Sequence, residues 1–396
     1  MKIKHFLFTT TLLCGSLTFT ACSDNDDPST DEGGGNSTTI NITPSVIGEA
    51  RNTTGVSPTN DESQAAINGY VDITVIPTYQ ILVQKTTALQ TAVSTFLTQK
   101  DQSSLDAACE AWLAAREPWE QSEAFLFGPA DYEGLDPSLD SWPLDKSGLR
   151  KVLADGTWGD IEDGSQESAQ TLRGFHTIEF LLFEDGAPRN VEFYSNEENR
   201  NAYEYLKRVT NLLVNDAQKL YKAWNEGLGT EEVPTAFGTE FKQHNTTRFG
   251  SIQAVISQVV DGCIDIASEV GSQKIGGPYN TYPYDKDKAL YDVESWYSWH
   301  SRDDYTNNIV SIENSYLGGP SGNRNEAQSL SALVKIANPN LDTELRERID
   351  IAKKAIQAIP QPFRNNIRNV NVPVAMQACS NLETALLKIK GALNLN

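Results

Sequence analysis

The sequence has few cysteines and histidines, which limits the disulfide and metal-binding chemistry open to it. Of the five cysteines in 396 residues, two fall within the first 22 residues. The other three are Cys109, Cys263 and Cys379. Three widely spaced cysteines do not form a disulfide framework, and each falls in a helical pattern, so we expect buried free thiols. One disulfide between two of them stays an alternative in an oxidising compartment.

The four histidines are His5, His176, His244 and His300. A zinc site made of three histidines would require the last three to meet, which we do not expect. His300 with Asp303 and Asp304 looks like a second cluster, and the favoured alternative is that the two aspartates complement the dipole of a helix N-terminus. The chain also lacks the HExxH motif of zinc proteases, a glycine-rich phosphate-binding loop and the GxSxG motif. None of the enzyme classes that these motifs mark is therefore indicated.

Basic residues are scarce relative to acidic ones. Lys and Arg total 32 against 53 Asp and Glu, which gives a formal net charge of −21 at pH 7. Such a surface repels nucleic acid and anionic lipid, so we expect no nucleic-acid partner. The same charge could attract cations, although it is also typical of an ordinary soluble surface.

Long apolar runs are absent after residue 22, since none approaches the roughly 18 uncharged apolar residues of a membrane-spanning helix. Residues 1–22 combine Lys2 and Lys4, an apolar stretch and small residues before Cys22, which is the pattern of a signal peptide. Their last four residues, FTAC, resemble the cleavage box of bacterial lipoproteins, in which Cys22 carries the lipid. An ordinary signal peptide with an incidental cysteine is the alternative, but we expect an anchored protein.

Residues 23–60 are predicted to form a disordered acidic tether, because residues 23–39 are acidic, rich in Gly and Ser, and free of aromatics. An acidic run directly after a lipidated cysteine resembles the export signal of surface lipoproteins in Bacteroidota-type bacteria. We therefore expect an outer-membrane lipoprotein, at the cell surface or on the periplasmic face.

The rest of the chain has helical periodicity and no alternating pattern longer than about five residues, which predicts an all-α fold. The long helical patterns cover residues 75–97, 104–125, 201–224, 251–275, 301–319, 338–359 and 374–395. Residues 127–168 and 274–291 are expected to be loops. Ser301 with Asp304 three residues on indicates a capping box. A break at residues 227–237 divides the body into 61–230 and 231–396.

His176 and Glu179 stand three residues apart in a strongly apolar segment, so they share one face of a buried helix. A buried glutamate must be paired, hydrogen-bonded or bound to metal. A structural His–Glu hydrogen bond would satisfy both side chains, and it is the alternative to a metal site. Gly174 is expected inside this helix, where a glycine costs roughly 1 kcal/mol relative to alanine, so it indicates a close approach by another group.

Glu120 and Glu123 are expected to share a helix face. If that face packs against His176 and Glu179, the set resembles the inward-facing carboxylates and histidines that hold iron or manganese in helical bundles. The alternative is a solvated acidic stripe that pairs with Arg116.

Residues 174–179, GFHTIE, match the GxHxxE motif of the imelysin family, and the chain resembles that family from about residue 71 onward. The segments AWLAAREPWEQSEAFLFGP, LDSWPLD, VGSQKIGGPY and VESWYSWHSRDDYTNNIVSIENSYLG follow in the family's order. The resemblance implies two packed helical-bundle halves, with GxHxxE in the first half near their interface. It also implies an envelope protein tied to iron acquisition, with His176 and Glu179 as the site.

Matching segments add further candidates. We expect Glu120 and Glu123 to join His176 and Glu179 as metal ligands. The residues expected to help bind the ligand are Gly174, Trp142, Asp145, Lys274, Asn308 and Ser311.

Three functions stay open. We favour a lipid-anchored protein that binds iron or an iron chelate, beside outer-membrane iron-uptake proteins. A metallopeptidase, the other activity attributed to the family, would use His176, Glu179 and Glu123 as ligands and Glu120 as base. Zinc fits it poorly, because one histidine per site is few. A partner-interaction module without metal is the third.

Overall fold

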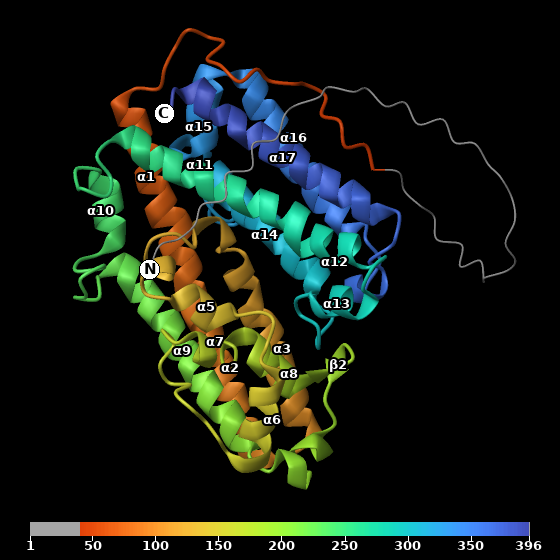
Figure 1. Cartoon of the computed structure of the whole chain (residues 1–396). Coiled ribbons are helices and arrows are strands. Elements are labelled where there is room, and N and C mark those ends of the chain that lie inside the picture. The colour runs from red at the N-terminus through yellow and green to blue at the C-terminus, as the bar shows by residue number, and fades with distance from the viewer. Residues whose placement is uncertain (1–39, 396) are drawn as a thin grey trace, which may run out of the picture. The chain divides into compact units, whose positions relative to one another are not determined.

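Helices make up nearly all the regular structure in the computed structural model, which describes residues 40–395 (Figure 1). The all-α prediction is confirmed. Within these residues the strands are β1 (Phe183–Glu184) and β2 (Ala187–Pro188), which form one short antiparallel hairpin. None of the helices described is long and apolar enough to cross a membrane. The predicted signal peptide with Cys22, and residues 23–39 of the predicted tether, lie outside the described residues.

The α-helices are α1 Asn60–Gly69, α2 Ile76–Gln99, α3 Gln102–Glu120, α4 Pro129–Tyr132, α5 Leu135–Asp140, α6 Lys146–Asp155, α7 Glu167–Gln170, α8 Gly174–Leu182, α9 Ala202–Asn225, α10 Phe237–Gln243, α11 Ile252–Glu269, α12 Gly276–Thr281, α13 Lys286–Tyr291, α14 Ser301–Leu317, α15 Leu330–Ala337, α16 Pro339–Gln357 and α17 Asn371–Leu393. Two π-helical turns, Tyr70–Val75 and Val270–Ile275, join α1 to α2 and α11 to α12. Short 3₁₀ turns cover Glu123–Phe125, Val191–Ser195, Glu197–Asn199, Glu326–Gln328 and Phe363–Asn365.

The long predicted helices are present, with ends shifted by a few residues. The pattern predicted over residues 104–125 is split, because α3 ends at Glu120. The two predicted loops are wrong in part: residues 127–168 contain α4 to α7, and residues 274–291 contain α12 and α13. These helices have 4 to 10 residues, too short for apolar periodicity to reveal.

The chain is already folded before the first predicted helix. Thr59 caps α1 with a capping box, in which its hydroxyl accepts from the Glu62 backbone N–H and the Glu62 carboxylate accepts from the Thr59 N–H. Upstream, the Gly48 N–H donates to Glu344 at 2.9 Å, and the Asn338 amide donates to the Glu49 carbonyl at 2.8 Å. From residue 40 onward, the segment predicted as a disordered tether is therefore held against α16.

Two groups of long helices supply most of the packing (Figure 1). α2 packs against α3 and α9, while α17 packs against α16 and α11. α14 contacts α3, α11 and α16, so it connects the two groups. All of these helices belong to one compact unit, and the division into halves at residues 230 and 231 stays a prediction.

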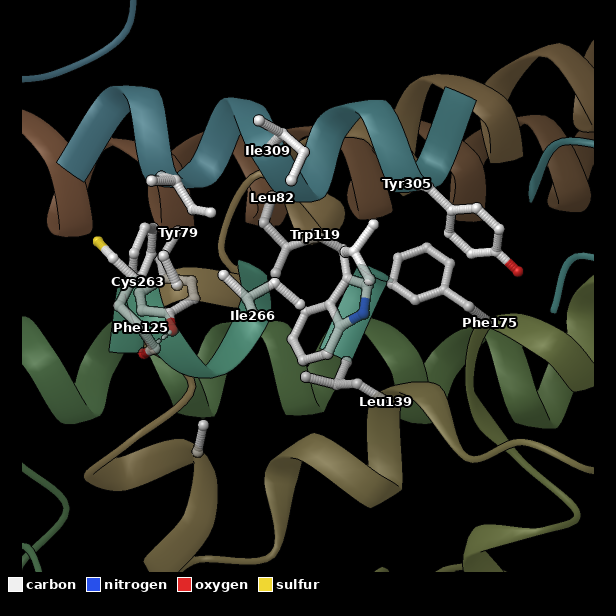
Figure 2. Packing of buried hydrophobic residues seen from close by; sticks show 14 of the residues in the cluster. Tyr79, Leu82, Trp119, Phe125, Leu139, Phe175, Cys263, Ile266, Tyr305 and Ile309 are labelled. Carbon is white, nitrogen blue, oxygen red and sulfur yellow. Dashed lines mark hydrogen bonds between the residues drawn. The ribbon is translucent and has the colours of Figure 1, made fainter. Parts of the chain in front are cut away.

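The core is richest in aromatic side chains around α3. Figure 2 shows Trp119 of α3 among Leu139, Phe175 and Ile266, which come from α5, α8 and α11. These four side chains are 0–2% exposed, and the Trp119 and Phe175 ring centroids are 6.3 Å apart. The packing of three other helices on this indole fixes the end of α3, where Glu120 lies.

Helix α11 approaches the turn Glu123–Phe125 at Gly262. A Cβ at this position would overlap the Ala124 carbonyl oxygen, so only glycine allows the approach. The Ala124 N–H also donates to the Ser311 hydroxyl of α14 at 3.0 Å. The backbone next to Glu123 is therefore held from two sides.

We expect Gly262→Ala to lower the free energy of unfolding by roughly 1–3 kcal/mol, because α11 must move away from the turn. Urea denaturation of the purified protein measures this change. Gly277→Ala in α12 is the matched control, since no atom lies within 4 Å of its added Cβ, and it should change stability by about 0.5 kcal/mol or less. Equal effects of the two substitutions would contradict the role given to Gly262.

Candidate functional site

Arg116 is the buried centre of the site. Its side chain is 0% exposed, and its guanidinium pairs with Glu120 at 2.6 Å and with Asp140. The Asp304 carboxylate lies 3.7 Å from Arg116 Nε. Since a buried charge is stable only when it is paired, this guanidinium requires acidic partners, which come from α3, α5 and α14. The predicted alternative was a solvated acidic stripe that pairs with Arg116. The pairing with Arg116 is correct, but the paired side chains are buried and not solvated.

His176 and Glu179 join this network from α8. His176 Nδ1 lies 2.9 Å from Glu179, and its Nε2 lies 3.3 Å from Asp140 and 3.5 Å from Arg116. Burial disfavours the imidazolium, but the nearby Asp140 carboxylate outweighs it and raises the pKa of His176. The helices carrying Glu120 and His176 therefore do pack together, as expected.

The second oxygen of Glu179 holds a distant loop. It accepts from the backbone N–H of Tyr297 at 3.0 Å and of Ser298 at 2.8 Å, and from the Ser298 hydroxyl at 2.7 Å. Three donors on one oxygen satisfy a buried carboxylate without metal. Whether His176 and Glu179 also bind metal stays a prediction.

Gly174 makes the approach of α8 possible. Its φ of +83° is strained for any other residue, and a Cβ there would overlap the Leu139 carbonyl oxygen of α5. The close approach predicted from this glycine is confirmed, but Gly174 is the first residue of α8 and does not lie in the helix interior. Its consequence is that His176 lies next to Asp140, the last residue of α5.

Glu120 and Glu123 converge with Asp140, although they do not share one helix as predicted. Carboxylate oxygens of the three residues all lie within 4.8 Å of one another, a spacing that one ion could bridge. Burial raises the pKa of Glu120 to about 8, because Arg116 is shared with other carboxylates and offsets the burial only in part. Burial also raises the pKa of Glu123 well above its usual range.

A cavity of about 420 Å³ opens beside these carboxylates. Its lining includes the acidic residues Glu123, Asp136, Asp140, Asp265, Glu269 and Glu294, together with Lys274 and Trp142. Burial raises the pKa of Asp136 to about 7. The cavity, which we call the acidic cavity, is therefore suited to a cationic ligand.

The candidates from the C-terminal part of the chain reach the site. The Asn308 amide donates to the Glu120 carboxylate at 2.5 Å, and Ser311 binds the backbone at Ala124. Lys274 Nζ lies 3.0 Å from Glu294. Asn308 and Ser311 both lie on α14, so this helix positions the carboxylates of α3 and the following turn.

The two candidates from residues 139–145 have different positions. The Trp142 ring lies 4.9 Å from the His176 ring, and its indole donates to the Tyr291 carbonyl at 3.2 Å. Asp145 is exposed and caps α6 by accepting from the Ser147 N–H at 3.0 Å. The structure thus brings Trp142 to the site, whereas the Asp145 carboxylate binds the N-terminus of α6.

Sequence reasoning assigned Asp304 the wrong role and missed Asp140. The capping box predicted for Ser301 and Asp304 is wrong: Ser301 donates to the Glu294 carbonyl at 2.6 Å. Asp304 instead accepts from Ser295 and lies 2.7 Å from His300 Nδ1, fully buried. The cluster that the sequence indicated for His300, Asp303 and Asp304 is present, since His300 Nε2 also lies 3.8 Å from Asp303. Asp140 has no comparable local signal, because its partners come from α3 and α8.

The predicted free thiols are confirmed. Cys109, Cys263 and Cys379 are buried and unbonded to one another. Burial raises the pKa of all three thiols, so they are poor nucleophiles and poor metal ligands.

The imelysin family model matches residues 75–389 of the chain. The chain belongs to the imelysin family. A relative from Synechococcus elongatus, named iron-regulated protein A, is 30% identical over 328 residues, which cover 83% of each chain. The crystal structure of a putative iron-regulated protein A precursor from Parabacteroides distasonis is 41% identical, with a TM-score of 0.81 over 86% of this chain and 97% of that one.

An imelysin-like protein from Psychrobacter arcticum has only 12% identity, yet its TM-score is 0.64 over 86% of this chain and 98% of its own. This likeness concerns the fold alone. The resemblance drawn from the GxHxxE motif and its flanking segments is thereby confirmed as family membership.

The His300–Asp304 pair should make stability depend on pH. Burial disfavours the imidazolium, but the Asp304 carboxylate raises the pKa of His300 to about 9. A raised pKa contributes stability that is complete below the unfolded pKa of about 6.5 and is lost as the pH rises through 9. We expect His300→Gln to cost on the order of 3 kcal/mol at pH 6 and clearly less at pH 10, by urea unfolding.

His244→Gln is the matched control, because this imidazole contacts Gln64 rather than a carboxylate. A cost of His300→Gln that is the same at pH 6 and pH 10 would contradict the charged pair.

Proposed function

We propose that this imelysin-family protein is a lipid-anchored envelope protein that binds iron for iron acquisition, with Glu120, Glu123 and Asp140 as ligands. The observation that carries the proposal is the convergence of their carboxylate oxygens within 4.8 Å, beside the acidic cavity. Buried carboxylates without a full set of hydrogen-bond donors are costly, and a bound cation would remove that cost.

The donor set fits iron. Carboxylate oxygens are hard donors, and helical bundles use inward-facing carboxylates for iron and manganese. Glu123 is the carboxylate most available to a metal ion. Among the described residues, the cationic group nearest to it is the Lys274 ammonium, at 3.9 Å. Oxygen ligands alone accept manganese or magnesium as well, so the choice of iron rests on the relatives named iron-regulated protein A.

We assign a positioning role to the GxHxxE residues. His176 contacts Asp140 at 3.3 Å, and Glu179 holds His176 and the backbone of Tyr297 and Ser298. In this role they orient a ligand without binding the metal. Partners that orient a metal ligand typically change affinity by about 10–100-fold when removed.

Metal titration tests the proposal. We expect the protein, expressed from residue 23, to bind Fe²⁺ without oxygen and Mn²⁺ with micromolar or tighter affinity by calorimetry. Glu123→Gln should weaken binding by more than about 100-fold, and His176→Ala by about 10–100-fold. Glu117→Gln is the matched control, since Glu117 lies on α3 but is exposed and bonded to Gln121.

Two results would contradict this assignment. Absence of binding by the wild-type protein would reject the metal-binding function. Loss of binding in His176→Ala with full binding in Glu123→Gln would move the metal to the GxHxxE pair.

The lipid anchor rests on the leader of residues 1–22 and on Cys22. We expect the wild-type protein to fractionate with the outer membrane and to carry the mass of attached acyl chains. Cys22→Ser should release it to the soluble fraction. An unmodified mass at Cys22 in the wild-type protein would contradict the anchor.

A further inference from the structure

Lys274 places a cation of the protein itself in the acidic cavity. Its side chain is 6% exposed, and Nζ lies 3.0 Å from Glu294, 3.8 Å from Glu269 and 3.9 Å from Glu123. The ammonium therefore competes with any bound cation for Glu123.

The backbone at Lys274 is fixed by its surroundings. Lys274 lies in the π-helical turn Val270–Ile275, and such turns occur frequently at functional sites. The turn packs tightly on α17, because a Cβ at Gly271 would lie 2.8 Å from the Cys379 Cβ. The ammonium can therefore move by side-chain rotation, while its backbone stays in place.

The pairing distances show how the ammonium can move away from Glu123. Glu294 is its closest partner and Glu123 its most distant one. Movement toward Glu294 would free Glu123 and still leave the ammonium paired. The cation site can therefore open without leaving a lysine charge unpaired.

Charge decides which form of metal suits the acidic cavity. Six carboxylate side chains and one ammonium group line it. An anionic chelate would meet repulsion from the ionised carboxylates of this lining, whereas a hydrated metal ion would be attracted. A monovalent ion carries no more charge than the tethered ammonium and gains little by replacing it.

We propose that Lys274 is a tethered competitor that fills the cation position of the acidic cavity, and that this cavity takes a free hydrated metal ion of charge two or more instead of an anionic iron chelate. The inference rests on the proposed function and names the form in which the metal arrives. Removal of the Lys274 ammonium should therefore change affinity in opposite directions for the two kinds of ligand. An anionic chelate would need the ammonium and would bind more weakly without it, whereas a free ion must displace the ammonium and would bind more tightly without it.

Substitution of Lys274 tests the direction of this change in affinity. We expect Lys274→Met to tighten Fe²⁺ and Mn²⁺ binding by on the order of tenfold at pH 7, because the competing charge is gone. Lys274→Arg keeps the charge and should leave affinity near the wild-type value. Lys354→Met is the control for net charge, since Lys354 is 64% exposed and pairs with Asp350 on α16. Ferric citrate should bind neither the wild-type protein nor Lys274→Met.

The outcomes are distinct. Unchanged or weaker metal binding by Lys274→Met, or ferric citrate binding that Lys274→Met abolishes, would overturn the inference while the proposed function stands. If neither the wild-type protein nor any variant binds an ion, the proposed function is rejected, and this inference is rejected with it. Lys274→Gln, which keeps a polar group beside Glu294, should tighten binding in the same way and replaces Lys274→Met if that variant does not fold.

Discussion

The guanidinium of Arg116 carries a positive charge where water does not reach it, and the surrounding elements are arranged to satisfy that charge. Glu120 and Asp140 pair with it directly, and Asp304 approaches it from α14. Removing one member of a buried ion network leaves the others uncompensated, which is far more costly than losing a surface pair. The helices α3, α5 and α14 therefore meet at one charge, and the acidic site exists because Arg116 stabilises its carboxylates.

On the side of the acidic cavity, the network has more carboxylates than its cationic side chains can compensate. Arg116 and His176 hold the pKa of Asp140 below its ordinary value despite its burial. Glu120 and Glu123, with less compensation, have raised pKa values. A carboxylate group that the protein compensates only in part is suited to exchange protons or the Lys274 ammonium for a metal ion.

The sequence predicted the long helices well, because an apolar face at helical spacing is a property of local sequence. It predicted α4 to α7 poorly, since these short helices form only on a completed core. At the site, His176, Glu179 and Gly174 were found from one motif on one helix. Asp140 was missed because its role is defined by contacts with α3 and α8, and Asp145, which has the same charge and lies in the same segment, caps α6 instead.

The position of a bound iron ion is the decisive test of the proposed carboxylate site. Crystals grown with Fe²⁺ in the absence of oxygen would be measured at the iron absorption edge, so that an anomalous difference map locates the metal. We expect one peak at the acidic cavity, about 2.0–2.6 Å from oxygens of Glu120, Glu123 and Asp140, with Arg116 still paired beside it. A peak bonded to His176 and Glu179 instead, or no peak at saturating iron, would contradict it.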